Sequence, residues 1–305
     1  MSHPTKSRAE ARSDFARWIE SERRLSPHTV AAYQRDLDQF ERFIGGWAGS
    51  EDWGWETVDR LTIRTWLGDL DGRGRAPATI ARKLSTVRVF LGFLHRTGEL
   101  DDNPARLIEA RAPRRKLPAF LSRDQVDELF ETTPSDQPTY LRDRAILELF
   151  YSSGLRLAEL HGLDVADLDL DAGTVRVVGK GRKERITPVG RQAATAIRRY
   201  LEADRGTGTD HTDPCLFTSR TGGRLSRRQI QRIVGRWLAE ATGGESMSPH
   251  ALRHTFATHL LDEGADLLVV KELLGHTSLS TTRIYTHTSR ERLLETYRLA
   301  HPRAD

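Results

Sequence analysis

The stretch Ser248-Pro-His-Ala-Leu-Arg253 has the pattern of a helix start and carries two side chains suited to binding an anion. A serine followed by proline is typical of the N-cap and first position of an α-helix, where a missing N–H costs nothing. His250 and Arg253 then share one face of the opening turn, to which free backbone N–H groups also point. Because this end of a helix favours anions, we expect a phosphate site here, with a neutral His250 that can accept a proton.

The histidines of this region raise the alternative of a metal site. His250 and His254 have the i,i+4 spacing of zinc-binding helices, and His259 follows them. The glutamate of the H-E-x-x-H pattern is absent, however, and Cys215, the single cysteine, excludes both a thiolate cluster and an internal disulfide. We therefore expect no metal here and prefer a phosphate as the ligand.

The composition favours a soluble protein of two domains. The 305 residues exceed a typical single domain, and 37% hydrophobic with 30% charged residues is the balance of a folded globular chain. No apolar run is long enough to span a bilayer and the first fifteen residues contain no export signal, so we expect a cytoplasmic protein without membrane contact. Only six of the 47 basic residues are lysines. This surplus of arginine suits a phosphate-rich partner, although a solvated arginine-rich surface explains it equally well.

Residues 1–110 are predicted to form a four-helix bundle. Apolar residues recur at helical spacing after the pair Ser26-Pro27, and Gly45-Gly46 is expected to end that helix. Two further helices follow, the last of which begins near Pro77, and short loops join the helices into a small bundle. The polar face of the last helix carries Arg82, Lys83 and Arg88.

The segment 111–118 holds two prolines and four basic residues and keeps neither helical nor strand periodicity, which indicates an interdomain linker. A second domain, 119–305, opens with a predicted capping box at Ser122 and Gln125. Residues 174–178 and 184–188 read as the two strands of a β-hairpin, and helices resume after it. The predicted fold class is therefore mainly α, with a helical bundle and a mainly helical second domain that contains a small antiparallel sheet.

Six residues in a fixed order single out this second domain: Arg156, Lys180, His250, Arg253, His276 and Tyr285. Taken singly, each has an ordinary structural explanation; Arg156, for example, could form a salt bridge with Glu159 three residues on. The ordered set, however, resembles the tyrosine site-specific recombinase family, also called phage-integrase-like. The hairpin 177-VVGKGRKER-185, the stretch 279-LSTTRIYTH-287 and the ending 300-AHPRA-304 are similar to its Xer branch, and the similarity extends over residues 12–304.

The resemblance implies that the enzyme breaks and rejoins DNA through a 3′-phosphotyrosine. Tyr285 would be the nucleophile and His250 its base, because a phenol needs help to ionise at neutral pH. Arg156 and Arg253 would hold the nonbridging oxygens of the scissile phosphate, where charge develops.

In the same scheme, His276 would add a hydrogen-bond donor and Lys180 would protonate the leaving 5′-oxygen, while Glu159 would orient Arg156. The phosphotyrosine conserves the bond energy, so the resemblance implies no cofactor. It also implies an N-terminal bundle of the family's SAM-like type. Arg82, Lys83 and Arg88 would then contribute to DNA contacts.

The implied partners are double-stranded DNA with paired half-sites, and a homo- or hetero-tetramer formed with a second copy or a paralogue. An apolar stripe in residues 291–299 is expected to pack against the neighbouring protomer, although a helix folded back on its own domain has the same pattern. A DNA translocase is a possible activator. Chromosome or plasmid dimer resolution is the expected role. The alternatives are a mobile-element or phage integrase, a type IB topoisomerase-like enzyme and a noncatalytic DNA-binding protein.

Overall fold

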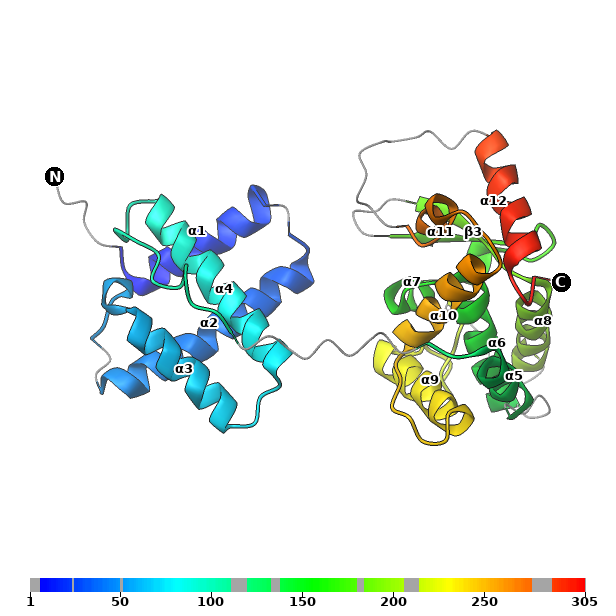
Figure 1. Ribbon diagram of the computed structural model, residues 1–305, viewed down its shortest axis with the longest axis horizontal. Coiled ribbons are helices and arrows are strands. Elements are labelled where there is room, and N and C mark those ends of the chain that lie inside the picture. The colour runs from blue at the N-terminus through cyan, green and yellow to red at the C-terminus, as the bar shows by residue number, and fades with distance from the viewer. Residues whose placement is uncertain are drawn as a thin grey trace. The chain divides into compact units, whose positions relative to one another are not determined.

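The computed structural model describes residues 6–23, 25–49, 52–110, 120–132, 138–179, 184–205, 214–275 and 287–304. The chain divides into two compact units, residues 1–115 and 116–305. Figure 1 shows that the first unit is built from helices, and that the second combines helices with a small sheet. The predicted fold class is therefore confirmed. No helix in the described ranges is long and apolar enough to cross a membrane.

The N-terminal unit packs four helices around an aromatic core. They are α1 (Arg8–Ser21), α2 (Pro27–Ala48), α3 (Arg60–Gly72) and α4 (Pro77–Arg96), with a 3₁₀ turn η1 (Trp55–Thr57) before α3. Phe15, Phe40, Trp66 and Phe90 are fully or almost fully buried in this core. Burial of such rings is the main contribution to the bundle's stability, because each removes a large apolar area from water.

The predicted end of the second helix is wrong. Instead of stopping at Gly45-Gly46, α2 continues to Ala48 and ends where Gly49 adopts a left-handed conformation with φ 65°. A glycine inside a helix costs only about 1 kcal/mol relative to alanine. The helix therefore ends at the position where the backbone needs a positive φ, which glycine accepts most easily.

The C-terminal unit is mainly helical. In chain order its elements are α5 (Arg123–Thr132), α6 (Pro138–Ser153), α7 (Leu157–His161), η2 (Val165–Asp167), β1 (Leu168–Asp169), β2 (Thr174–Val178), β3 (Glu184–Pro188), α8 (Arg191–Arg205), α9 (Arg227–Ala241), α10 (Pro249–Asp262), α11 (Leu267–Leu273) and α12 (His287–Ala300). The capping box of Ser122 and Gln125 is present at the start of α5, as predicted. Helix α6 packs against α8 and α10 and lies at the centre of the unit.

The predicted hairpin is present, and a short third strand extends it into an antiparallel sheet of order β1-β2-β3. The register pairs Val175 with Thr187 and Val177 with Arg185. Since residues two apart in a strand share a face, these four side chains point into the domain, where all of them are buried. An arginine thus occupies the core face of β3, while Ile186 is 40% exposed on the opposite face.

A sharp turn separates α6, which ends at Ser153, from α7, which begins at Leu157. Gly154 has φ 57° there, and a Cβ on it would lie 2.5 Å from the Phe256 ring of α10. Only glycine satisfies both the positive φ and this close approach. Because the chain turns at Gly154, Arg156 becomes the N-cap residue of α7.

The last helix, α12, packs on α10 and α11 of its own chain (Figure 1). Leu293, Tyr297 and Ala300 are buried in this contact. The Tyr297 hydroxyl lies 2.8 Å from Ser152 Oγ of α6. In the single chain, Leu293 and Tyr297 of the apolar stripe therefore pack on their own domain, which is one of the two arrangements that the sequence allows.

Candidate active site

Arg156 and Glu159 form an ion pair with two hydrogen bonds at the start of α7. The Arg156 side chain donates from Nη1 to Glu159 Oε1 at 2.8 Å, and its backbone N–H donates to Oε2 at 2.7 Å. The expected orientation of Arg156 by Glu159 therefore has a geometric basis. The Arg156 side chain is 37% exposed, whereas that of Glu159 is buried, so the pair presents its cation to solvent and not its anion.

Arg253 reaches the same place from the first turns of α10. Its Nη1 donates to the Gly154 carbonyl of the α6–α7 turn, and its Nη2 donates to the Leu274 carbonyl at 2.5 Å. The residue is 8% exposed. Burial, followed by the positive charge of Arg156, lowers the pKa of Arg253 to about 10. The Arg253 cation is thus held in a place that disfavours positive charge, a cost that a bound anion would relieve.

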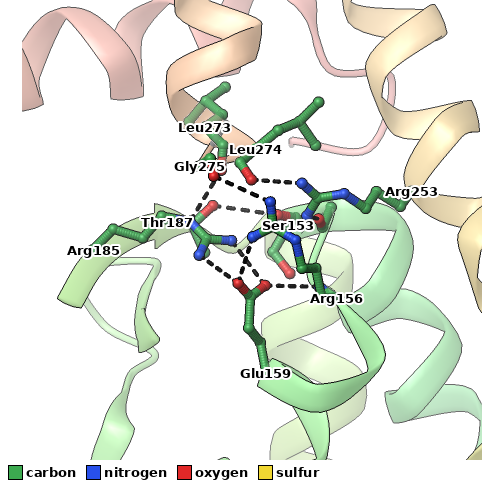
Figure 2. Close-up of polar contacts among 10 residues, drawn as sticks. Ser153, Arg156, Glu159, Arg185, Thr187, Arg253, Leu273, Leu274 and Gly275 are labelled. Atoms are coloured by element: carbon green, nitrogen blue, oxygen red, sulfur yellow. Dashed lines mark hydrogen bonds and ion pairs between the residues drawn. The ribbon is translucent and has the colours of Figure 1, made fainter. Parts of the chain in front are cut away.

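A third arginine, Arg185 of β3, binds the same Glu159 carboxylate as Arg156 (Figure 2). It donates from Nη1 and Nη2 to the two oxygens of Glu159, at 2.7 and 3.0 Å. Although burial favours the neutral form of Glu159, these bonds, with those from Arg156, hold the pKa of its carboxyl below its ordinary value. Sequence reasoning missed Arg185. No local signal marks it, because the strand register that places Arg185 opposite Val177 on the core face is set by the tertiary structure.

The three arginines also bind three consecutive carbonyl groups at the end of α11. Arg185 Nε donates to Leu273 at 3.3 Å, Arg253 to Leu274, and Arg156 Nη2 to Gly275 at 3.1 Å. We call these three arginines, with Glu159, the arginine cluster. Carbonyl oxygens at a helix C-terminus lack partners within the helix, so cations there are favourable.

The arginine cluster contains three cations and one anion. No acidic side chain other than Glu159 forms an ion pair with any of these arginines within the described parts of the chain. The surplus of positive charge lies next to the partly exposed guanidinium of Arg156. Such a group can bind two oxygens of an anion such as a phosphodiester. Arg156 and Arg253 of the predicted anion site therefore lie together in this cluster, and Arg185 is bound behind them to Glu159.

His250 lies in the first turn of α10, as predicted, and is exposed to solvent. Ser248 is the N-cap and Pro249 the first helical residue, although the Ser248 side chain makes no capping hydrogen bond. His250 is therefore one turn from Arg253 and accessible to a substrate.

The other two histidines of α10 have structural surroundings. His254 packs edge-on against the Phe120 ring. His259 is buried, accepts from the Tyr151 hydroxyl at Nδ1 (2.9 Å) and donates from Nε2 to the Leu121 carbonyl (3.0 Å). In the ranges that the structure describes, His, Cys, Asp and Glu side chains form no group of three that could hold a metal ion.

Three of the predicted site residues, Lys180, His276 and Tyr285, lie outside the described residues. Their neighbours in the chain are placed: Gly275, which precedes His276, is held by Arg156, and the strand β2 ends two residues before Lys180. The described half of the predicted set, Arg156, His250 and Arg253, lies around the start of α7 and α10.

In the N-terminal unit, two of the three basic residues on α4 have hydrogen-bond partners within the protein. Lys83 is buried and binds Asp36 of α2 at 2.8 Å, because a buried carboxylate on the facing helix requires a cation. Arg88 donates to the Ala105 carbonyl at 3.0 Å and also to that of Ile108. The expectation of an outward-facing side chain is therefore wrong for Lys83, whereas Arg88 is half-buried. The Arg82 side chain also binds Asp36 but is 51% exposed.

Both units of the chain match known protein families. The family described as "Phage integrase family" matches residues 119–292, and "Phage integrase, N-terminal SAM-like domain" matches residues 13–98. A tyrosine recombinase XerC from Pelobacter propionicus is 48% identical over 95% of this chain and 94% of its own. A tyrosine recombinase XerC from Haemophilus influenzae is 42% identical over 94% and 95% of the two chains.

Solved structures share the fold. A XerH site-specific recombinase bound to a palindromic DNA substrate has a TM-score of 0.69 at 23% identity, covering 94% of this chain and 84% of that one. The Tn1549 transposon integrase in complex with circular intermediate DNA also has a TM-score of 0.69, at 17% identity over 92% and 98% of the two chains. The fold, the matched family models and these relatives lead to one conclusion: the chain belongs to the phage integrase family and is a site-specific tyrosine recombinase.

Proposed function

We propose that the arginine cluster is the phosphate-binding part of an active site in which Tyr285 cuts DNA through a 3′-phosphotyrosine. The observation that carries this assignment is the surplus of cations at one place. Arg156 and Arg253 converge from different elements on the end of α11, and a single carboxylate balances three guanidinium groups.

Arg156 and Arg253 have the capacity to bind a phosphate as well as the protein. A guanidinium carries five N–H groups. Each of these two side chains uses two nitrogens in the hydrogen bonds described above. The remaining donors would hold the nonbridging oxygens and would gain strength as negative charge develops on them in the phosphorane-like transition state.

The proposed cleavage step forms one bond and breaks one. The Tyr285 oxygen attacks the phosphorus, the bond from phosphorus to the 5′-oxygen breaks, and the phenolic proton passes to His250. Lys180 gives a proton to the leaving 5′-oxygen, and His276 donates a hydrogen bond to the phosphate. Rejoining is the same sequence in reverse with a 5′-hydroxyl as nucleophile, so the reaction needs no external energy source and no cofactor.

Double-stranded DNA with two half-sites is the proposed substrate, bound by a homo- or hetero-tetramer. Residues 1–110 would be the DNA-binding domain, 111–118 a linker and 119–305 the catalytic domain. On the N-terminal unit, Arg82 remains a candidate DNA contact because half of its side chain is exposed.

Dimer resolution of chromosomes or plasmids in the cytoplasm, with a translocase as possible activator, is the proposed biological role. The relatives named tyrosine recombinase XerC, similar over nearly the whole chain, favour it over integration of a mobile element. Sequencing the DNA that the purified protein protects separates the two roles. A single chromosomal site with two half-sites supports dimer resolution, whereas sites at the ends of a mobile element contradict it.

Covalent trapping tests the proposed chemistry. A suicide substrate nicked beside the cleavage point prevents rejoining, so the wild-type protein should accumulate a DNA adduct that survives a denaturing gel. Tyr285→Phe should bind the same DNA and form no adduct. Tyr297→Phe is the matched control, because it removes the hydroxyl of a buried tyrosine bound to Ser152 and should still form the adduct. An adduct with Tyr285→Phe would eliminate Tyr285 as the nucleophile.

A further inference from the structure

We propose that Arg185 is a positioning residue for strand cleavage, which acts by fixing both the Glu159 carboxylate and the end of α11. This inference rests on the proposed function, since it assigns to Arg185 the support of Arg156 and of the segment that carries His276 and Tyr285. Arg185 itself would not touch the DNA.

The burial and bonding of Arg185 exclude a direct phosphate contact. Its side chain is 7% exposed, on the core face of β3. All three guanidinium nitrogens donate to protein acceptors: Nη1 and Nη2 to Glu159, and Nε to the Leu273 carbonyl. By contrast, the Arg156 side chain is 37% exposed. The two arginines bind the same carboxylate from different elements, but only Arg156 faces outward.

Arg185 fixes the orientation of Glu159, and Glu159 fixes Arg156. Each carboxylate oxygen accepts one bond from each arginine: Oε1 from the two Nη1 groups, and Oε2 from Arg185 Nη2 and the Arg156 backbone. A carboxylate held at both oxygens by a forked guanidinium cannot rotate without breaking charge-assisted bonds. Without Arg185, Glu159 would keep only Arg156 as its cation, and its rotamer would no longer be fixed from the β3 side.

The second contact of Arg185 is with the segment that leads to the nucleophile. The Leu273 carbonyl, which accepts from Arg185 Nε, ends α11 two residues before Gly275. A Cβ on Gly275 would lie 3.2 Å from three atoms of the Arg185 guanidinium group, so the backbone there passes directly over it. Gly275 is followed in sequence by His276, and Tyr285 comes ten residues after Gly275. Arg185 thus anchors the chain at the end of α11, directly before His276 in the sequence.

The physical consequence is a loss of rate and not of DNA affinity. Holding a nucleophile and a phosphate in the correct relative position supplies a large part of an enzyme's rate acceleration. A displacement of about 1 Å lowers the rate about 100-fold. DNA affinity, in contrast, is spread over many phosphate contacts, to which a buried Arg185 adds none. We therefore expect Arg185→Gln to lower the rate constant of adduct formation by about 10- to 100-fold at saturating protein, with the dissociation constant changed by less than about threefold.

The experiment measures adduct formation in single turnover on the suicide substrate, together with the dissociation constant and the melting temperature. Arg224→Gln is the matched control, because Arg224 also binds a carboxylate, Asp164, and two backbone carbonyls, those of His161 and Leu163. Losing these contacts should lower the melting temperature and the fraction of active protein, while each folded molecule reacts at the wild-type rate.

Two further variants keep the proposal testable if Arg185→Gln does not fold. Arg185→Lys retains the charge beside Glu159 but cannot bind both carboxylate oxygens and the Leu273 carbonyl together, so it should fold and recover part of the rate. Arg185→Gln with Glu159→Gln removes the buried pair as a whole and avoids an unpaired charge. Since both residues act through Arg156, its rate should be closer to that of the slower single variant than to the product of the two losses.

A variant Arg185→Gln or Arg185→Lys that cleaves at the wild-type rate per folded molecule would overturn the positioning role. So would independent, multiplying losses in the double variant. A wild-type protein that forms no adduct at all would instead overturn the proposed function, so the two failures are distinguishable.

Discussion

Arg253 Nη2 donates to the Leu274 carbonyl at 2.5 Å, which ties the first turns of α10 to the end of α11, two residues before His276. Its Nη1 donates to Gly154 in the break between α6 and α7. One side chain therefore joins the first turns of α10, the break before Arg156 and the end of α11. Arg253 binds two backbone carbonyls and is also a proposed phosphate ligand. The forked shape of its guanidinium is therefore needed for these contacts as well as its charge.

Arg253→Lys should reduce the rate constant of adduct formation by about 100-fold or more, because an ammonium group cannot bridge two carbonyls and still hold a phosphate oxygen. Single-turnover cleavage of the suicide substrate measures this loss. DNA binding should change little, since one phosphate contact among many is altered. Arg198→Lys, a half-exposed residue bound to Asp171, serves as the control and should react normally. A near wild-type rate for Arg253→Lys would remove Arg253 from the proposed site.

Lys180→Ala should cleave ordinary DNA slowly and recover strongly when a sulfur replaces the bridging 5′-oxygen. A thiolate leaves without a proton, since the pKa of its thiol is about 8.5, whereas an alkoxide needs one. Arg156→Ala should recover much less, because its loss affects the nonbridging oxygens. Comparing the two variants on both substrates in single turnover makes the test. Equal defects of Lys180→Ala on the two strands would refute the general-acid role.

The folded state should lose stability in acid through His301. Burial lowers the pKa of His301 to about 3, while the nearby charges of His259 and Arg303 add to this and the Tyr151 carbonyl opposes it. Its Nδ1 accepts from the Arg303 backbone N–H, which requires the neutral ring. The unfolded chain, with a histidine pKa of about 6.5, binds the proton first as the pH falls. Stability should therefore drop by about 1.4 kcal/mol per pH unit between about pH 6 and pH 3 from this residue alone.

Chemical unfolding of the wild type and His301→Gln at several pH values measures this effect. The variant lacks the titrating ring, so its stability should depend less on pH over the same window, although it starts lower at neutral pH. Parallel curves for the two proteins would show that His301 is protonated in the folded state as readily as in the unfolded chain, against the prediction.

Leu293→Ala should destabilise the catalytic unit by about 2–4 kcal/mol, because Leu293 is buried against α10 and α11 of its own chain. Leu299→Ala on the same helix is the control, with 81% exposure and an expected change within about 0.5 kcal/mol. Thermal unfolding at low protein concentration measures both. If Leu293→Ala left stability unchanged but weakened cooperative binding to a DNA with two half-sites, the helix would pack on a neighbouring protomer in solution.

This packing also changes what truncation should do. If the tail packed only on a neighbouring protomer, removing the chain after Ser289 would spare binding to a single half-site. Such a truncation removes Tyr297, whose hydroxyl bonds to Ser152, and His301, which bonds to the Tyr151 carbonyl. We now expect loss of folded protein, so point variants are the better probe of the tail.

Local signals in the sequence located most of the elements correctly. The capping box at Ser122 and the proline after Ser248 are short-range features, and each marks the start of a helix in the structure. The hairpin strands have the predicted bounds for the same reason. The misplaced end of α2 at Gly45-Gly46 shows the limit of such signals, because a weak helix former does not end a helix whose apolar face is packed.

The sequence by itself determined the family, the order of the six proposed catalytic residues and the pairing of Arg156 with Glu159, because these depend on residue types and on spacings of a few positions. Only the tertiary structure decided that Lys83 and Arg88 have structural partners, that Arg185 belongs to the cluster, and that three arginines meet three consecutive carbonyls of α11. These contacts join residues 17 to 119 positions apart. Their partners are set by strand register and helix packing, which no local periodicity specifies.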